Sequence, residues 1–348
     1  MMQSRSLRAA FLALIVFVVS TSATRSLSVT LTGPEAVNSV KHLRIIATVT
    51  NTGDETLKVL NDPRGPLNKL PTDTFVITDA KNTQPSFTGI KLKYVPKTAA
   101  ALERYIILAP GESVVVEHDL GIAYNFTAAG PAIYDIHTRN PFYIVNPDST
   151  ISTLLASVHS HATKISGKLA VARPALVKRA NYNGCSASQK TLISAAALVA
   201  QDYAAGALTY AKSLTSSTTR YTTWFGAYNT ARHSTVVSHF SAINDNRFSS
   251  YTFDCSTCNE ADTFAYVYPD DYGTIYLCDV FWQAPMMGEN SKGGTLVHEA
   301  SHFTKNGGTD DHAYGHTACQ SLARNAPDTA VDNADSHEYF AENDPPLP

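Results

Sequence analysis

The amino-acid composition changes abruptly at the basic pair Lys178-Arg179, and this change most constrains how the chain can fold. Residues 24–179 carry 17 Lys and Arg against 12 Asp and Glu, whereas residues 180–348 carry 8 against 18 and contain all five cysteines. With 348 residues the chain is long enough for about two domains. We therefore expect a basic N-terminal domain and an acidic C-terminal one. The overall net charge of −3 argues against nucleic acid as a partner.

The first residues have the composition of a secretory signal peptide. Arg5 and Arg8 precede the apolar run Ala9–Val19, and small residues follow at 20–23. The run is shorter than the roughly 20 apolar residues that a membrane span needs, and no later segment reads as long enough. We therefore expect a secreted, extracellular protein without a membrane partner, with residues 1–23 as its signal peptide.

Residues 24–179 predict an all-β, sandwich-like region. Short alternating or β-branched runs recur, with Gly or Pro between many of them, which is typical of a β-sandwich. These runs are Leu27–Thr32, Leu43–Val49, Leu57–Leu60, Thr74–Ile77, Ile90–Val95, Tyr105–Leu108, Ser113–Val116 and Phe142–Val145.

The Lys178-Arg179 pair indicates how these β-rich residues are used. Two adjacent basic residues in a linker of a secreted precursor are a natural processing site, so we interpret residues 24–179 as a propeptide. Its net charge complements the acidic residues 180–348, which favours a role as intramolecular chaperone and inhibitor. The alternative is an independent domain that binds carbohydrate or protein.

Residues 180–348 predict an α+β domain. Apolar residues at helical spacing indicate helices over Ser186–Leu214 and Trp224–Ile243. Phe264–Tyr268 and Thr274–Leu277 indicate two strands around a turn at residues 269–273. Helical patterns return after this hairpin.

The sequence Gly294–His302 contains an H-E-x-x-H motif. On a helix His298 and His302 lie one turn apart on a common face, so both imidazoles can bind one zinc ion at about 2.0–2.1 Å. Glu299 lies beside the metal, where it can take a proton from zinc-bound water and deliver it to a leaving amine. We expect Gly307-Gly308 to end this helix. The motif predicts a catalytic zinc site.

A third protein ligand must complete a catalytic zinc site. No Glu occurs between Glu299 and Glu338, but the glycines at 307 and 308 can reverse the chain and return a nearby side chain to the metal. Spacing alone does not choose among the candidates, which are Asp310, Asp311, His312 and His316.

The sequence H-E-A-S-H followed by G-T-D-D-H-A-Y-G resembles the deuterolysin, or aspzincin, family of fungal zinc metalloproteases, whose pattern is HExxH and then GTxDxxYG. It is especially similar to the family's peptidyl-lysine metalloendopeptidases. The resemblance covers residues 181–348. Its further motifs are Asn181–Cys185, Tyr221–Gly226, Phe264–Pro269 and Asn333–Phe340.

The resemblance implies a zincin-like catalytic domain with one Zn²⁺ per chain. His298, His302 and Asp311 would be its ligands, and Glu299 the general base. Tyr314 would donate its phenol to the tetrahedral oxyanion, a role that needs a donor near the polarised carbonyl.

The resemblance also implies an acidic pocket, made by Asp335 and Glu338, for a substrate lysine. On a helix these residues lie three positions apart and share a face, so two carboxylates could surround one ammonium group. From acidity alone, an acidic surface helix is the simpler interpretation. With the resemblance, we expect cleavage at the amino side of lysine.

The cysteines indicate disulfides, because a secreted chain favours them over a structural zinc site. Four cysteines allow three pairings, and spacing does not resolve them. The resemblance implies Cys185–Cys255 and Cys258–Cys278, which leaves Cys319 as a buried free thiol.

The sequence therefore predicts a secreted, monomeric zinc endopeptidase, made as a pro-enzyme. Its expected partners are lysine-containing proteins or peptides and its own propeptide. One alternative is a deuterolysin-type protease of broad specificity. Another, from a different class, is a non-catalytic secreted binding protein that retains the metal, against which the intact Glu299 argues.

Overall fold

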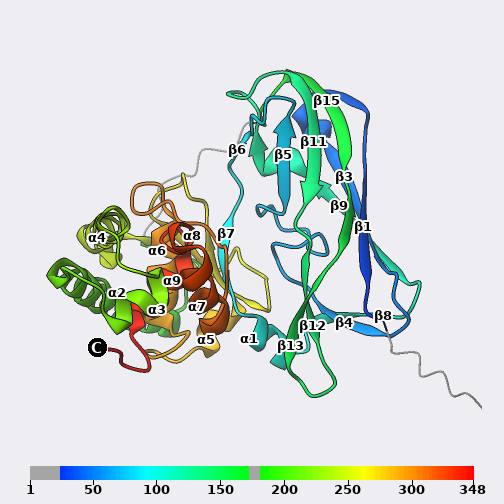
Figure 1. The fold of residues 1–348 in the computed structure, drawn as a ribbon. Coiled ribbons are helices and arrows are strands. Elements are labelled where there is room, and N and C mark those ends of the chain that lie inside the picture. The colour runs from blue at the N-terminus through cyan, green and yellow to red at the C-terminus, as the bar shows by residue number, and fades with distance from the viewer. Residues whose placement is uncertain (1–23, 172–180) are drawn as a thin grey trace, which may run out of the picture.

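The structure, a computed structural model, describes residues 24–171 and 181–348. The expected signal peptide at residues 1–23 and the Lys178-Arg179 pair lie outside the described residues. In Figure 1 a β-rich part, coloured blue to green, lies beside a helical part coloured green to red. The change in composition along the sequence therefore corresponds to a change in architecture.

The N-terminal part consists mainly of three four-stranded sheets, in the orders β14-β1-β3-β9, β2-β15-β11-β5 and β13-β12-β4-β8. Along β3 every second residue is buried, because successive side chains of a strand point to opposite faces. The strands are β1 (Leu27–Thr32), β2 (Ala36–Ser39), β3 (Arg44–Asn51), β4 (Leu57–Leu60), β5 (Phe75–Asp79), β6 (Ser86–Phe87), β8 (Tyr105–Leu108), β9 (Ser113–Asp119), β10 (Tyr124–Asn125), β11 (Ala132–Thr138), β12 (Pro141–Val145), β13 (Ile151–Leu155), β14 (Ser157–His159) and β15 (His161–Lys168).

This part is not purely β. It also has the short helix α1 (Pro96–Ala101) and two 3-10 turns, at Val40–His42 and Leu120–Ile122. Pro96 stands at the first helical position, where its missing N–H costs nothing, and alanines with high helix propensity follow it.

The C-terminal part packs helices around a mixed sheet of order β16-β17-β19-β18-β7. Its own strands are β16 (Tyr182–Asn183), β17 (Thr252–Asp254), β18 (Thr263–Val267) and β19 (Thr274–Leu277). Its helices are α2 (Ala187–Ser213), α3 (Thr219–Phe225), α4 (Thr230–Asp245), α5 (Asp279–Gln283), α6 (Lys292–His302), α7 (His316–Asn325), α8 (Pro327–Ala330) and α9 (Ala334–Glu342), with a 3-10 turn at Phe248–Ser250. The molecule is therefore a mixed α and β structure with several sheets.

The last strand of this sheet comes from the other part of the chain. β7 (Lys91–Tyr94) belongs to the N-terminal region, yet it pairs antiparallel with β18. Figure 1 shows it in cyan, between the β-rich part and the helices. The two parts of the molecule therefore share a sheet.

Two predicted helix boundaries are wrong. The helix expected over Trp224–Ile243 is interrupted, because Gly226 has a φ of +74° and Asn229 caps a new helix, α4. The motif helix α6 ends at His302 and not at Gly307-Gly308. Phe303 leaves it with extended backbone and packs its ring against Tyr251 and Tyr272.

The expectation that no segment after the signal peptide could span a membrane is also wrong for α2. By length and composition alone, this helix of 27 residues passes as a span, because an 18-residue window of it has a mean hydropathy of 1.2. Its alanines raise the hydropathy, and one face of the helix lies in the core with α4 and α6. The buried residues of that face are Ile193, Ala196, Ala197, Ala200, Ala204, Ala207, Leu208 and Ala211.

Candidate active site

The two histidines of the motif and Asp311 meet in the core of the C-terminal part. His298 and His302 lie one turn apart on α6, with their Nε2 atoms 3.1 Å apart. The loop after α6 folds back, and the Thr309 amide donates to the Ser301 carbonyl oxygen at 3.2 Å. This returns Asp311 to the helix, so that its carboxylate oxygens lie 3.3 Å from His298 Nε2 and 3.4 Å from His302 Nε2.

These three side chains fit a metal ion. His302 Nδ1 lies 2.9 Å from the Thr309 carbonyl oxygen, and His298 Nδ1 lies 2.8 Å from a carboxylate oxygen of Asp335. With the proton of each ring assigned to Nδ1, both Nε2 lone pairs face each other inside the protein. Such an arrangement is repulsive unless a cation lies between them. Two imidazoles and one carboxylate are the donor set of a catalytic zinc.

Asp311 is the only one of the four candidate third ligands that faces both histidines. Asp310 lies 3.5 Å from Lys91 Nζ, and His312 lies 2.8 Å from the Asp332 carboxylate. His316 packs against the rings of Trp224 and Tyr339. Burial would raise the pKa of Asp311, but the two histidines hold that pKa well below its usual range. Asp311 is therefore the candidate that the structure brings to the motif.

Glu299 is fully buried beside this cluster. Its Oε1 accepts a hydrogen bond from the backbone amide of Lys93 at 3.0 Å, whereas Oε2 has no hydrogen-bond partner among the described residues. Burial raises the pKa of Glu299 to about 8, and the nearby charge of Asp311 adds to the shift. A carboxyl with such a pKa can both accept and release a proton near neutral pH.

The phenol of Tyr314 faces the peptide group between Leu92 and Lys93, the group whose amide contacts Glu299. Its hydroxyl donates to the carbonyl oxygen of Leu92 at 2.6 Å. The guanidinium of Arg64, from the N-terminal part, lies 4.0 Å from the centre of the Tyr314 ring and donates to the Asp311 carbonyl oxygen at 2.6 Å. Tyr314 is thus oriented toward a peptide carbonyl, as an oxyanion donor would be.

Asp335 and Glu338 lie on α9 and are fully buried, so they do not form an exposed acidic face. Between them lies the ammonium group of Lys93, which is 2.5 Å from Glu338 Oε2 and 3.6 Å from Asp335 Oδ1. Burial would lower the pKa of Lys93, but the two carboxylates raise it, so the group stays charged.

Three further residues contact this ammonium group and were not predicted. Asn290 Oδ1 accepts a hydrogen bond from Lys93 Nζ at 3.1 Å, and the rings of Phe264 and Tyr339 lie 5.3 Å and 5.5 Å away. The two aromatic residues belong to motifs that the sequence shares with the aspzincins, but Asn290 lies in a loop without any local signal. The sequence also did not predict that Asp335 contacts His298.

The structure contains the disulfides Cys185–Cys255 and Cys258–Cys278, the pairing that the resemblance implies. The first joins the residues just before α2 to the residue just after β17. In the second, Cys278 directly follows β19. Cys319 is free and buried on α7, as expected. Two disulfides agree with an oxidising compartment.

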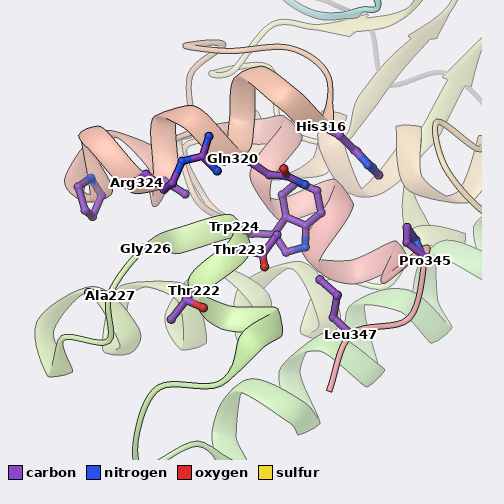
Figure 2. Close-up of a pocket in the computed structure, with 12 residues that line it drawn as sticks. Thr222, Thr223, Trp224, Gly226, Ala227, His316, Gln320, Arg324, Pro345 and Leu347 are labelled. Atoms are coloured by element: carbon purple, nitrogen blue, oxygen red, sulfur yellow. The ribbon is translucent and has the colours of Figure 1, made fainter.

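A concave surface lies apart from His298, His302 and Asp311 and from the acidic pair Asp335 and Glu338. Figure 2 shows it between α3, α7 and the C-terminal segment, with Trp224, His316, Arg324 and Leu347 around it. His316 lies at its edge, on the α7 side. Since the residues that line this pocket include no carboxylate, it is not the catalytic site.

Several known proteins are similar to this chain over much of its length. Residues 210–342 match the aspzincin family described as lysine-specific metallo-endopeptidase. A peptidyl-Lys metalloendopeptidase of Grifola frondosa is 52% identical over 339 residues, 96% of this chain and 97% of that protein. One of Armillaria mellea is 50% identical over 99% of both chains. One of Pleurotus ostreatus is 61% identical over 168 residues, which are 48% of this chain and 99% of that protein.

The family match and these relatives show that the chain is a metalloendopeptidase and that its cofactor is zinc. With relatives this similar over nearly their whole length, the chain belongs to the aspzincin family.

Proposed function

We propose that this protein is a secreted zinc endopeptidase that cleaves at the amino side of lysine and is made as a pro-enzyme. In this proposal residues 1–23 are a signal peptide, residues 24–179 a β-rich propeptide and residues 180–348 a zincin-like domain built on the H-E-x-x-H helix. One observation carries it: a lysine ammonium group lies between Asp335 and Glu338 while the peptide bond before that lysine lies beside Glu299 and Tyr314.

His298, His302 and Asp311 hold the zinc ion in this mechanism. When bound, zinc supplies Lewis-acid chemistry, which polarises the peptide carbonyl and makes water more acidic. Glu299 takes the proton from the attacking water and passes it to the departing nitrogen. The hydrogen bond from the Lys93 backbone amide to Glu299 Oε1 supports the transfer to the nitrogen. Tyr314 donates its phenol to the oxygen that becomes negative.

Specificity for lysine comes from the charge and burial of the pocket. An ammonium group that enters it leaves water, and only close carboxylates compensate the lost hydration. Glu338 and the amide oxygen of Asn290 accept hydrogen bonds from the ammonium group, and the Asp335 carboxylate, 3.6 Å away, adds a second negative charge. An apolar side chain would leave the two buried carboxylates without a cation, so the pocket discriminates against it.

Two observations support secretion and the pro-enzyme organisation. The two disulfides agree with an extracellular protein. The Pleurotus ostreatus relative matches only 48% of this chain, which supports a mature enzyme of about half its length.

The proposal is tested by digesting a denatured protein with the activated, zinc-loaded enzyme and sequencing the new N-termini. We expect lysine at the first position of nearly all of them. Many different residues there would favour the broad-specificity alternative. Absence of new N-termini would favour a non-catalytic binding protein that contains metal, but the buried Glu299 beside the metal ligands argues against that alternative.

A further inference from the structure

Strand β7 lies in the active site as a bound peptide would. It adds to the end of the sheet beside β18, with Leu92 opposite Tyr266 and Lys93 opposite Ala265. Adding an extended strand to a sheet edge is a general way of binding peptides, because main-chain hydrogen bonds hold any sequence in a fixed register. β7 belongs to the N-terminal part of the same chain, so this binding is intramolecular.

One peptide bond of β7 lies between the proposed catalytic side chains. The carbonyl oxygen of Leu92 accepts a hydrogen bond from the Tyr314 hydroxyl at 2.6 Å, and the amide of Lys93 donates to Glu299 Oε1 at 3.0 Å. The Leu92 amide donates to Asp311 Oδ2 at 3.3 Å. The oxygen that would become negative thus faces its donor, and the nitrogen that would leave faces its proton carrier.

The lysine after this bond occupies the specificity pocket. The side chain of Lys93 is fully buried between Asp335 and Glu338. Lys91, two positions earlier, points elsewhere, because its ammonium donates to the Thr309 carbonyl oxygen at 2.8 Å. The register of β7 therefore makes Leu92–Lys93, and not a neighbouring bond, the one that has both a lysine in the pocket and its atoms at the catalytic residues.

We infer that the Leu92–Lys93 bond is an internal cleavage site of this enzyme. The inference rests on the proposed function. Water adds to the carbonyl carbon of Leu92, the bond to the nitrogen of Lys93 breaks, and Glu299 transfers one proton from the water to that nitrogen. The new carboxylic acid gives its remaining proton to the released amine, so the products are a carboxylate at Leu92 and an ammonium N-terminus at Lys93, and no further reactant is needed.

The full chain, loaded with zinc, provides the test. Its products are followed by intact mass and N-terminal sequencing. The same measurements are made on Lys93→Met and Glu299→Gln. Lys97→Met, which changes an exposed lysine nearby, is the matched control. We expect a fragment that begins at Lys93 from the wild type and from Lys97→Met. Its release is at least 100-fold slower from Lys93→Met and from Glu299→Gln.

A synthetic peptide with one internal lysine, added to the same samples, separates this inference from the proposed function. If the wild type or Lys93→Met cuts the peptide while the Leu92–Lys93 bond of the wild type stays intact, the inference is overturned and the proposed function stands. If neither chain cuts the peptide or the bond, the proposed function fails as well. Equal release of the fragment from Glu299→Gln assigns the cut to another protease and also overturns the inference.

Chemical labelling of the unmodified, metal-free chain adds a readout that needs neither activity nor a variant. Reductive methylation followed by mass spectrometry measures how fast each lysine reacts. With its ammonium buried between two carboxylates, Lys93 is expected to react at least 100-fold more slowly than Lys97. Equal rates at the two lysines would show that β7 does not occupy the pocket, and the inference would fall.

Discussion

The Oδ1 atom of Asp335 lies 2.8 Å from Nδ1 of His298 and 3.6 Å from the ammonium nitrogen of Lys93. One carboxylate on α9 therefore supports a candidate metal ligand from behind and lines the candidate lysine pocket. Glu338, one turn further along the helix, is closer to the ammonium group, at 2.5 Å, and farther from His298, at 3.4 Å. The two acidic residues consequently have different expected roles.

Neutralising Glu338 is expected to weaken recognition of lysine and leave zinc in place. Truncating one partner of a buried charge pair costs about 2–5 kcal/mol, so Glu338→Gln is expected to lower kcat/KM for lysine substrates at least about 30-fold. Zinc content, measured on the same samples, stays at one ion per chain. Asp202→Asn, which removes an exposed acidic charge from α2, is the control and leaves both quantities unchanged.

Asp335→Asn is expected to affect both functions. Partners behind a metal-bound histidine typically change metal affinity about 10–100-fold, so this variant binds zinc more weakly than Glu338→Gln and also cleaves lysine substrates more slowly. Competition with a zinc chelator measures the affinity. Equal zinc affinity in the two variants would contradict the role of Asp335 behind His298.

Tyr314→Phe tests the oxyanion donor. The phenol contacts a peptide carbonyl oxygen at 2.6 Å and is not among the three candidate metal ligands. Removing one such donor costs about 10²–10³ in kcat, whereas KM and zinc content are expected to change little. Steady-state kinetics on one lysine peptide checks this. A loss confined to KM would assign Tyr314 to substrate binding instead.

The pH dependence of stability is expected to reflect His337. This buried ring lies against His239, with Nε2 3.1 Å from His239 Nδ1, and its own Nδ1 is 3.0 Å from the Asn333 carbonyl oxygen. Burial and the neighbouring His239 lower the pKa of His337 to about 3, whereas in the unfolded chain the value is about 6.5.

Because the unfolded state then binds more protons, the free energy of unfolding falls as the pH drops from about 6.5 toward 3. The contribution of His337 approaches about 1.4 kcal/mol per pH unit. Denaturant unfolding at several pH values measures this slope, which should be shallower in His337→Gln. His159→Gln, at an exposed position, serves as the control and keeps the wild-type slope. An unchanged slope in His337→Gln would contradict the assignment.

Much of this molecule could be predicted from sequence, for local reasons. The strands β1, β4 and β8 begin and end where the predicted runs do. In β1 every second residue is buried, because burial of one face imposes a period of two. The positions of His298 and His302 on one helical face follow from helix geometry alone. The role of Asp311 as third ligand could not be predicted from geometry, because the turn after the helix leaves four polar candidates. Only the resemblance to the aspzincins singled out Asp311.

The role of β7 could not be predicted. Ile90–Val95 reads as an ordinary strand of the N-terminal sheets, yet the structure pairs it with residues 263–267 of the other part. Lys93 of this strand also lies between the distant residues Asp335 and Glu338, and no local pattern around Lys93 reveals these contacts. The role of Asn290 could not be predicted either, because its contact with Lys93 exists only after the two parts of the chain pack together.

The most direct measurement of the central claim is the activity and zinc content of Glu299→Gln. Glutamine keeps the shape of the side chain but cannot accept a proton from water. Glu299 is also outside the cluster of His298, His302 and Asp311. We predict one zinc ion per chain, as in the wild type, with hydrolysis of a lysine peptide reduced by about 10²–10⁴-fold or more. Unchanged hydrolysis in a zinc-containing Glu299→Gln chain would contradict the account.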